Sequence, residues 1–544
     1  MAEYRDALRA AQRAMQDADW TLARAEFETA LQSGPSGMAF DGLGQALWFL
    51  GDVADGIATR EQAFEQYVGE GRCDDAARIA VWVSHQNFVA GRASAARGWL
   101  GRCERALADV EGECAGHGWL VMERARHSQS VDEQVAHARR AFEIAVAAGA
   151  SDLEVFALSL LGRAEVAAGR RDVGIALLEE AMAAASAGRV RDVHTLAEAY
   201  CNLIIACTTA GEWERATEWC EVVDEFARRH QTLPLMGACR TVHADVLIAT
   251  GRWDDAEDAL ASAIETHSRF VAQMSDPAIA TLAELRVRQG RLAEARELLA
   301  GREEHPSALR AVALVRLAEG RPRAAIALLE RGLRSCEGDD IRATQLLAPL
   351  VDACLACADH DKARAAVAAM ARLSEASGIR VVVARGALAA ARLALADGEA
   401  DAATEAARRS FAAFDDLSMP LDAGEARLVL ARAASDPDVA GEHARAACEA
   451  FRALGATRAM DEAAAVMRDL GAATPARGRT AGELTARETE VLALIALGMS
   501  NARIGQELVI SEKTAGHHVS HILNKLGVSN RTEAAAHAAR LSSD

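Results

Sequence analysis

Three histidines lie within five residues near the end of the chain, in the stretch "ISEKTAGHHVSHILNKLGVSN" that covers 510–530. His517 and His521 are four residues apart, a spacing at which two imidazoles on one helix face can bind zinc. A histidine can also serve as a general base in catalysis. However, no third metal ligand or HExxH glutamate stands nearby, and no carboxylate is placed to orient a base. We therefore expect neither a metal site nor an enzyme.

The side chains around these histidines separate into two arcs when the segment is placed on a helical wheel at about 100° per residue. One arc is apolar and should be buried: Ala515, Val519, Ile522, Leu523 and Leu526. The opposite arc is polar and should face outward: Lys513, His517, Ser520, His521 and Asn524. Gly516 borders the outward arc, although glycine costs a helix about 1 kcal/mol relative to alanine.

Helix-capping signals place this segment as the third of four short helices. Thr485 and Glu488 form a capping box for a first helix that ends at Gly498. Ser500 should cap a second helix, and Ser511 should cap the third, which runs to about 526. A fourth helix should begin at 530 or 531. Two short helices joined by a tight turn, the second of them long and regular, are typical of a helix-turn-helix.

The sequence "LTARETEVLALIALGMSNARIGQELVISEKT", from 484 to 514, resembles the C-terminal DNA-binding domain of the LuxR family. The resemblance extends to 541, roughly a tenth of the chain. It implies a four-helix domain that inserts its third helix into the major groove and often dimerises through its fourth. Many large members of the family also carry an ATP-binding module. This chain has no GxxxxGK[ST] motif, so we expect no nucleotide cofactor.

Within this domain, short polar side chains on the outward arc are suited to base edges, and other groups can reach phosphates. Gly516 should let the backbone approach the groove closely. We assign the phosphate contacts to Arg503, Thr514 and Lys525. The predicted DNA-binding residues are Arg503, Lys513, Thr514, Gly516, His517, Ser520, His521, Asn524 and Lys525.

The rest of the chain has the composition and period of a helical-repeat protein. Hydrophobic residues make up 51% and aromatic residues 4% of the 544 residues, which favours an all-α fold. Glycines recur at intervals of about 40 residues or about twice that, with one step of about 30, and a small residue follows each of them five positions later. The glycines are Gly51, Gly91, Gly169, Gly211, Gly251, Gly290, Gly320 and Gly398.

Each repeat reads as a helical hairpin whose glycine ends the first helix and whose small residue lets the two helices cross closely. About a dozen hairpins should form an α-solenoid over 1–470, followed by a linker at 471–483 and the DNA-binding domain at 484–544. The repeats resemble tetratricopeptide repeats, although the full Trp, Leu-Gly, Tyr pattern of that family is missing. The repeat pattern does not specify the superhelical pitch.

Net charge limits where DNA can bind. The formal charge is −19, so a nucleic-acid contact must be confined to a local patch. Residues 484–541 carry six basic and five acidic side chains, too few cations for tight binding by one copy. We therefore expect a homodimer on a palindromic operator in double-stranded DNA. No signal peptide or membrane-spanning segment is evident, so we expect a cytoplasmic protein.

Three features outside the C-terminal domain admit more than one interpretation. Cys354 and Cys357 form a CxxC inside an expected helix and lack a second pair, so we expect a structural role. All eight tryptophans precede 254 and should be core residues, although a lined pocket is conceivable. The solenoid is either a sensor whose groove binds a peptide, protein or small-molecule ligand, or a scaffold. The alternative function is a scaffold or adaptor whose helix-turn-helix mainly dimerises.

Overall fold

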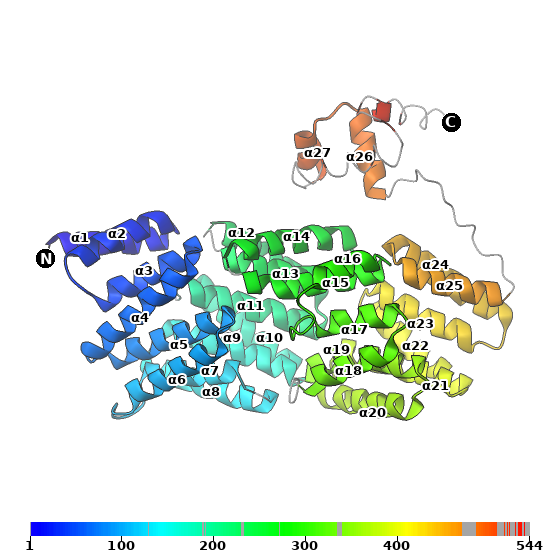
Figure 1. Cartoon of the computed structure of the whole chain (residues 1–544), viewed down its shortest axis with the longest axis horizontal. Coiled ribbons are helices and arrows are strands. Elements are labelled where there is room, and N and C mark those ends of the chain that lie inside the picture. The colour runs from blue at the N-terminus through cyan, green and yellow to red at the C-terminus, as the bar shows by residue number, and fades with distance from the viewer. Residues whose placement is uncertain are drawn as a thin grey trace. The chain divides into compact units, whose positions relative to one another are not determined.

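The computed structural model divides the chain into two compact units, unit 1 (1–471) and unit 2 (472–544), drawn in Figure 1. It describes residues 2–128, 130–187, 190, 192–229, 233–270, 272–334, 340–470 and 486–508. Near the C-terminus it also describes 516, 519, 522, 528, 531, 533–535 and 538. Every regular element in these ranges is helical, which confirms the all-α prediction.

Unit 1 is a succession of helices joined by short turns. In chain order they are α1 (Ala2–Gln16), α2 (Trp20–Gln32), α3 (Gly37–Leu50), α4 (Val53–Gly69), α5 (Cys73–Val89), α6 (Ala93–Leu107), α7 (Ala115–Arg126), α8 (Val131–Ala148), α9 (Ser151–Ala167), α10 (Arg171–Ser186), α11 (Val193–Ala210), α12 (Trp213–Arg229) and α13 (Leu233–Ala249). The series continues with α14 (Trp253–Phe270), η1 (Ala272–Ser275), α15 (Asp276–Arg288), α16 (Leu292–Leu299), α17 (Leu309–Ala318), α18 (Pro322–Arg334), α19 (Asp340–Ala356), α20 (His360–Ser377), α21 (Arg380–Ala396), α22 (Ala400–Asp416), α23 (Pro420–Ala433), α24 (Pro437–Leu454) and α25 (Thr457–Asp469).

Consecutive helices pair into hairpins, from α1 with α2 to α23 with α24, which confirms the predicted dozen. All eight glycines of the repeat pattern adopt the left-handed conformation, with φ between 72° and 93°. At Gly51 the turn is closed in the usual way for a helix end, because Asp52 N donates to Leu47 O at 2.9 Å. The hairpin of α19 and α20 uses Ala358 instead (φ 55°), which explains the doubled interval between Gly320 and Gly398.

The small residues of the repeat lie where two helices of a hairpin cross. A Cβ added to Gly162 would lie 2.7 Å from the carbonyl oxygen of Gly174, and one added to Gly174 would lie 2.5 Å from that of Gly162. Gly44 and Gly56 make the same approach between α3 and α4. In the other hairpins the small residue is an alanine, and most of these alanines, such as Ala216 and Ala256, are completely buried. The predicted close crossings are therefore confirmed.

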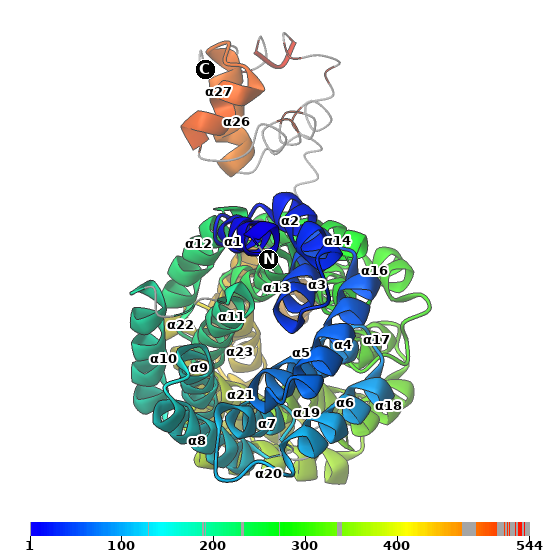
Figure 2. The ribbon, with the colours of Figure 1, turned by 90° about the vertical axis from the view of Figure 1, so that its left-hand side faces the viewer.

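The first and second helices of a hairpin have different surroundings. The first helix packs against its partner and against the first helix of the next hairpin, as α9 does with α11 and α19 with α21. The second helix buries a single stripe, as α6 does with Ala96, Trp99, Cys103 and Leu107. Figure 2 looks into the ring of hairpins and shows α9 and α11 on the inside, with α8, α10 and α12 on the outside.

Successive turns of the superhelix in unit 1 pack against each other. The turn at Gly169 lies against the backbone of Ser377, where an added Cβ would come within 2.1 Å of the carbonyl oxygen. Gly211 likewise meets Leu417, and Gly251 meets Leu454. Residues about 200 apart in sequence are thus in contact, which sets the length of chain in one superhelical turn. One continuous core joins α13 to α15 with α23 to α25.

The interior of the N-terminal part of unit 1 is filled by its own aromatic side chains. Trp82 on α5 stacks on His194 at 4.7 Å and on Phe156 at 6.0 Å between ring centroids. Trp48 and Trp119 complete the cluster, and both are buried. These tryptophans are core residues, as the sequence favoured.

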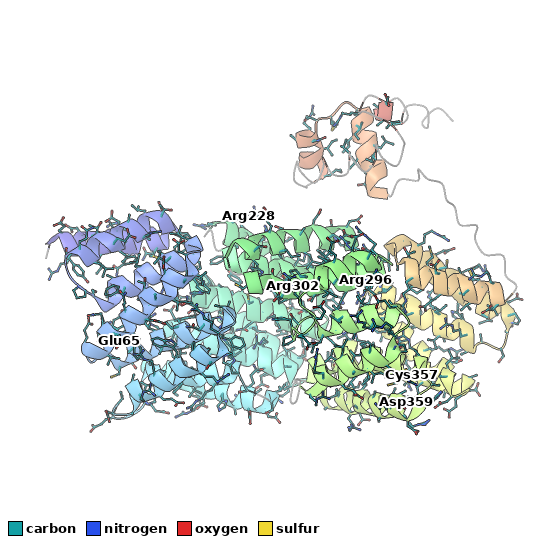
Figure 3. The ribbon with its side chains drawn as sticks, in the orientation of Figure 1. Glu65, Arg228, Arg296, Arg302, Cys357 and Asp359 are labelled. Atoms are coloured by element: carbon teal, nitrogen blue, oxygen red, sulfur yellow. The ribbon has the colours of Figure 1, made fainter. Side chains whose placement is uncertain are left out.

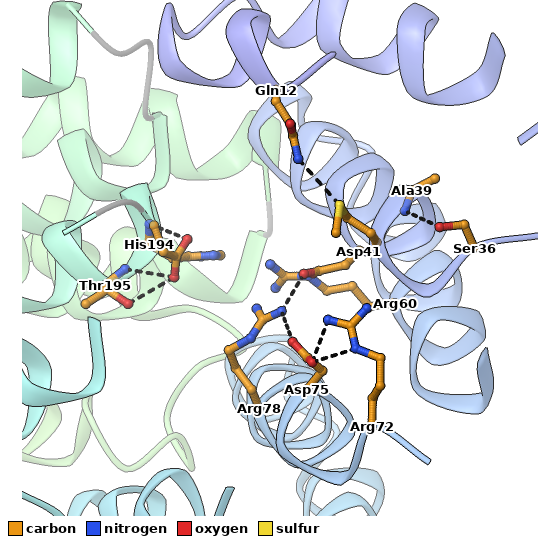
Figure 4. Close-up of polar contacts among 12 residues, drawn as sticks. Gln12, Ser36, Ala39, Asp41, Arg60, Arg72, Asp75, Arg78, His194 and Thr195 are labelled. Atoms are coloured by element: carbon orange, nitrogen blue, oxygen red, sulfur yellow. Dashed lines mark hydrogen bonds and ion pairs between the residues drawn. The ribbon is translucent and has the colours of Figure 1, made fainter. Parts of the chain in front are cut away.

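Buried ion pairs lie in the same part of unit 1. Figure 4 draws the polar contacts around Asp41, Arg60 and Arg78. The Nε of Arg60 lies 3.4 Å from one carboxylate oxygen of Asp41, and Arg78 donates to the other at 2.8 Å. Asp192 caps α11 by accepting from the backbone and hydroxyl of Thr195. Buried charges of this kind need partners to offset desolvation. Packed aromatic side chains and ion pairs therefore occupy this part of the interior.

No helix in the described ranges combines the length and the apolar character needed to cross a lipid bilayer.

The turn-to-turn contact can be tested by comparing Gly169→Ala with Gly398→Ala. Both glycines have φ near 80°, so both alanines carry the same backbone strain, about 1–2 kcal/mol. The Cβ of an alanine at 169 would also collide with the backbone of Ser377, whereas nothing lies within 4 Å of a Cβ at Gly398. We expect Gly169→Ala to lower the thermal unfolding midpoint of the full chain further and to speed amide exchange around Ser377. Equal losses in the two variants would contradict packing between turns at this point.

Candidate nucleic-acid interface

The first two helices of unit 2 are α26 (Ala486–Ala496) and α27 (Asn501–Leu508), orange in Figure 1. Gly498 ends α26 in the left-handed conformation, with φ 76°. The hydroxyl of Ser500 accepts a hydrogen bond from the backbone N of Arg503 at 3.3 Å, as an N-cap does. Both capping predictions are confirmed. Thr485, the predicted start of α26, lies outside the described residues.

A small apolar core holds unit 2 together. Its members come from α26, α27 and two later helical segments: Val491, Leu492, Ile495, Ile504, Val519, Ile522, Ala534 and Ala538. Val519 is 8% exposed and Ile522 is 0% exposed, so the buried arc predicted for the third helix is confirmed at these two positions. Ala515, Leu523 and Leu526, also assigned to that arc, lie outside the described residues.

Two of the nine predicted DNA-binding residues belong to the described part of the chain. Arg503 is exposed on α27, and Gly516 is helical. The other seven lie outside the described residues: Lys513, Thr514, His517, Ser520, His521, Asn524 and Lys525. Their assignment to the outward arc remains a prediction, based on the wheel and on the buried positions of Val519 and Ile522.

Arg531 has a positioning role that the sequence did not reveal. Its guanidinium donates to the side-chain oxygen of Asn501 at 2.8 Å and to the carbonyl oxygen of Met499. It thereby ties the last helical segment to the turn that joins α26 and α27. The contact spans about thirty residues, and no local pattern signals it.

Asn501 also faces the segment that carries Gly516. A Cβ added to Gly516 would lie 3.4 Å from the amide nitrogen of Asn501, which is close to ordinary contact distance. The third helical segment therefore passes close to the start of α27, with room for a Cβ at this position. Packing within the described residues thus does not require a glycine here, and the close approach to DNA stays a prediction.

The CxxC near the middle of unit 1 differs from the expectation in one respect. Cys354 lies in α19, but that helix ends at Ala356, so Cys357 lies in the turn beside Asp359, as Figure 3 marks. The prediction that both cysteines are inside a helix is wrong, because Ala358 takes the left-handed conformation that ends the helix early. Burial raises the pKa of the Cys354 thiol to about 11, which disfavours the thiolate that metal binding needs.

Metal ligands can be assessed only where side chains are described. There, no group of three or more histidine, cysteine, aspartate or glutamate side chains is arranged to hold an ion. His517, His518 and His521 are not among those residues, so the structure does not test the zinc alternative at the histidine cluster.

Comparison with known proteins identifies the C-terminal segment. Residues 482–538 match the family described as bacterial regulatory proteins, luxR family. The transcriptional regulatory protein LiaR of Bacillus subtilis (strain 168) is 54% identical over 57 residues, which are 10% of this chain and 27% of LiaR. DegU of Brevibacillus brevis is 57% identical over 51 residues, which are 9% of this chain and 22% of DegU.

A longer match is found with the DNA-binding transcriptional activator DevR/DosR of Mycobacterium tuberculosis (strain ATCC 25618 / H37Rv). It is 36% identical over 95 residues, 17% of this chain and 43% of that protein. The chain thus spans about a quarter to less than half of the length of these three relatives.

Two solved structures are similar over most of the chain. The structure of yeast Tom70 has a TM-score of 0.37 and 12% identity, covering 81% of this chain and 98% of that one. The APC/C hetero-tetramer Cut9-Hcn1 has a TM-score of 0.43 and 15% identity, covering 97% and 95%.

The role assigned to Arg531 can be tested against an exposed arginine of the same unit. Arg531→Ala removes two donors to the α26–α27 turn, so local opening should become easier by about 1–3 kcal/mol. Hydrogen exchange of the full chain should quicken in peptides that cover 499–504. Arg503→Ala is the control, because its side chain has no hydrogen bond or ion pair among the described residues and should leave this exchange unchanged. Unchanged hydrogen exchange at 499–504 in Arg531→Ala would contradict the positioning role of Arg531.

Proposed function

We propose that this protein, whose C-terminal unit is a LuxR-type helix-turn-helix domain, is a transcription regulator that binds double-stranded DNA. The observation that carries the proposal is the luxR-family match over 482–538, where the described residues form capped helices around one core. The matched relatives are named as transcription regulators, but the match covers only part of their length. A DNA-binding role is the function this unit supports best.

In this proposal the third helix of unit 2 lies in the major groove. Val519 and Ile522 face the core, so the wheel assigns the opposite arc to DNA. His517, Ser520 and their neighbours on that arc read base edges. Arg503, exposed on α27, contacts a phosphate together with Thr514 and Lys525.

Charge favours two copies acting together. Six basic side chains against five acidic ones give residues 484–541 almost no net attraction for the DNA backbone. A homodimer doubles the phosphate contacts and matches a palindromic site. The strongly acidic remainder of the chain reduces binding to DNA without that site, because it repels the phosphate backbone.

Unit 1 receives the signal in this proposal. It is a solenoid of hairpins whose inner helices line the interior, a construction suited to a ligand or to a partner protein. The segment at 471–483 is the link through which a change in unit 1 alters the freedom of unit 2. In this proposal unit 1 responds to the signal and unit 2 recognises the DNA.

Selection from random duplexes tests recognition directly. The full chain should enrich a palindromic motif, and His517→Ala should relax preference at one base pair per half-site, at a cost of about 1–3 kcal/mol. An alanine variant of exposed Arg228 on α12 in unit 1 is the control and should select the wild-type motif. If the wild-type chain enriches no motif, the result would contradict sequence-specific DNA binding and favour the scaffold or adaptor function.

Salt dependence tests whether Gly516 lies near the DNA. Gly516→Lys adds one cation per subunit, so binding to all sequences should strengthen and the slope of log K against log salt should steepen by about two for a dimer. The ratio of specific to non-specific affinity should fall. Gly516→Ala is the matched control, because it raises helix propensity and meets Asn501 equally but adds no charge. The same slope in both variants would place this position away from the DNA backbone.

A further inference from the structure

Two adjoining cavities lie among the inner helices of the C-terminal half of unit 1. Their volumes are about 480 and 680 Å³, within the range of roughly 300–1,000 Å³ that small-molecule sites occupy. Both are lined by Glu284, Arg288, Arg310, Arg385 and Asp422, so the two spaces share a charged wall. That wall is built from α15, α17, α21 and α23.

The arginines of the shared wall have few partners. Arg288 and Arg385 make no ion pair or hydrogen bond with any described residue. Arg310 pairs with Glu284 at 2.5 Å, but its Nε is buried without an acceptor.

A neighbouring arginine shows the contrast. Arg392 lines only the larger cavity and is held by Asp352 at 2.8 Å and by Glu425 at 2.6 Å. Two carboxylates thus hold Arg392, whereas none among the described residues holds Arg288 or Arg385. A desolvated guanidinium without a partner is costly, and a ligand that supplies an anion would offset that cost.

Electrostatics at the wall favour a single negative charge on the ligand. Burial lowers the pKa of the Arg385 guanidinium, which Asp422 raises and Arg310 and Arg288 lower further, yet arginine stays charged at neutral pH. Glu284 and Asp422 already provide negative charge. Burial also raises the pKa of Asp245 in the smaller cavity to about 6, with Glu284 acting in the same direction. These carboxylates disfavour a ligand with several negative charges.

The smaller cavity combines this wall with apolar and hydroxyl-bearing surface. Trp213, Ile248, Val381 and Met419 provide apolar contact, and Thr281 and Thr344 provide hydroxyl groups. The smaller cavity thus places apolar contacts beside charged and hydroxyl-bearing groups, a combination suited to a small organic molecule that carries an anion.

We propose that the smaller cavity binds a small organic monocarboxylate, with its carboxylate at Arg288, Arg310 and Arg385 and its apolar body against Trp213 and Met419. The proposal rests on the proposed role of unit 1 as the part that receives the signal. It is tested on the full chain without DNA, so that its failure and a failure of DNA binding remain distinguishable.

The test is ligand-induced stabilisation. Phenylpropionate and cyclohexylacetate are the probes, each beside its primary amide and beside inorganic phosphate, at concentrations up to about 10 mM, far above the Kd of an ordinary small-molecule site. At least one carboxylate should raise the thermal midpoint and change tryptophan fluorescence, whereas the amides and phosphate should not. Trp213→Phe should remove the fluorescence change and keep the thermal shift.

Arg385→Gln is the decisive variant, with Arg380→Gln as its control. Arg380 lies on the same helix but is exposed, pairs with Asp416 and lines neither cavity. Arg385→Gln should weaken carboxylate binding about ten- to a hundredfold. It should also leave the unliganded midpoint equal or higher, since an unpaired charge is removed. Arg380→Gln should bind like the wild type.

Three results would overturn the proposal. The first is the absence of any shift with both carboxylates. The second is a shift of equal size with phosphate or with the amides, which would show that a carboxylate is not what the cavity recognises. The third is undiminished binding by a folded Arg385→Gln variant.

Discussion

The close crossing of two helices within each hairpin is the constraint on which unit 1 depends. At Gly162 and Gly174 the backbones approach so nearly that a Cβ on either residue would collide with a carbonyl oxygen. Such a crossing brings the two helices together but leaves the inner helix with apolar surface on its other sides. Only the neighbouring hairpins can cover that surface, so the hairpins must stack. Stacking in turn determines which side chains face the interior.

The interior is treated differently in the two halves of the solenoid. In the N-terminal half, Trp82 and its aromatic neighbours fill the space, and ions such as Arg60 and Asp41 are paired there. In the C-terminal half, cavities remain, and Arg385 faces them without a partner. Filling one half gives rigidity, because packed side chains resist rearrangement. In the other half, an arginine without a carboxylate partner costs stability, and the ligand that we propose would offset this cost.

The helices of unit 2 are held in place by a small apolar core and by a few polar contacts. Its core is short, so a few polar contacts matter more to the placement of its helices than they would in a large domain. Arg531 and Asn501 connect the last segment to the α26–α27 turn, and Gly516 lies near the same asparagine. The segment that carries Gly516 thus packs beside the same asparagine that Arg531 binds.

The sequence by itself determined the features that depend on neighbouring residues. Glycine at Gly498 and serine at Ser500 predict helix ends, and the spacing of Val519 and Ile522 predicts a buried face, because backbone geometry relates these positions locally. The repeat period predicted the dozen hairpins for the same reason. The early end of α19 was missed, because an alanine, Ala358, takes a conformation that favours glycine.

Only the tertiary structure decided the contacts between residues distant in the chain. The packing of Gly169 on Ser377, the bond from Arg531 to Asn501 and the gathering of Arg288, Arg310 and Arg385 on one wall have no local signature. The superhelical turn brings these residues together. It follows from the sum of small rotations between successive hairpins, a quantity that no single repeat of the sequence specifies.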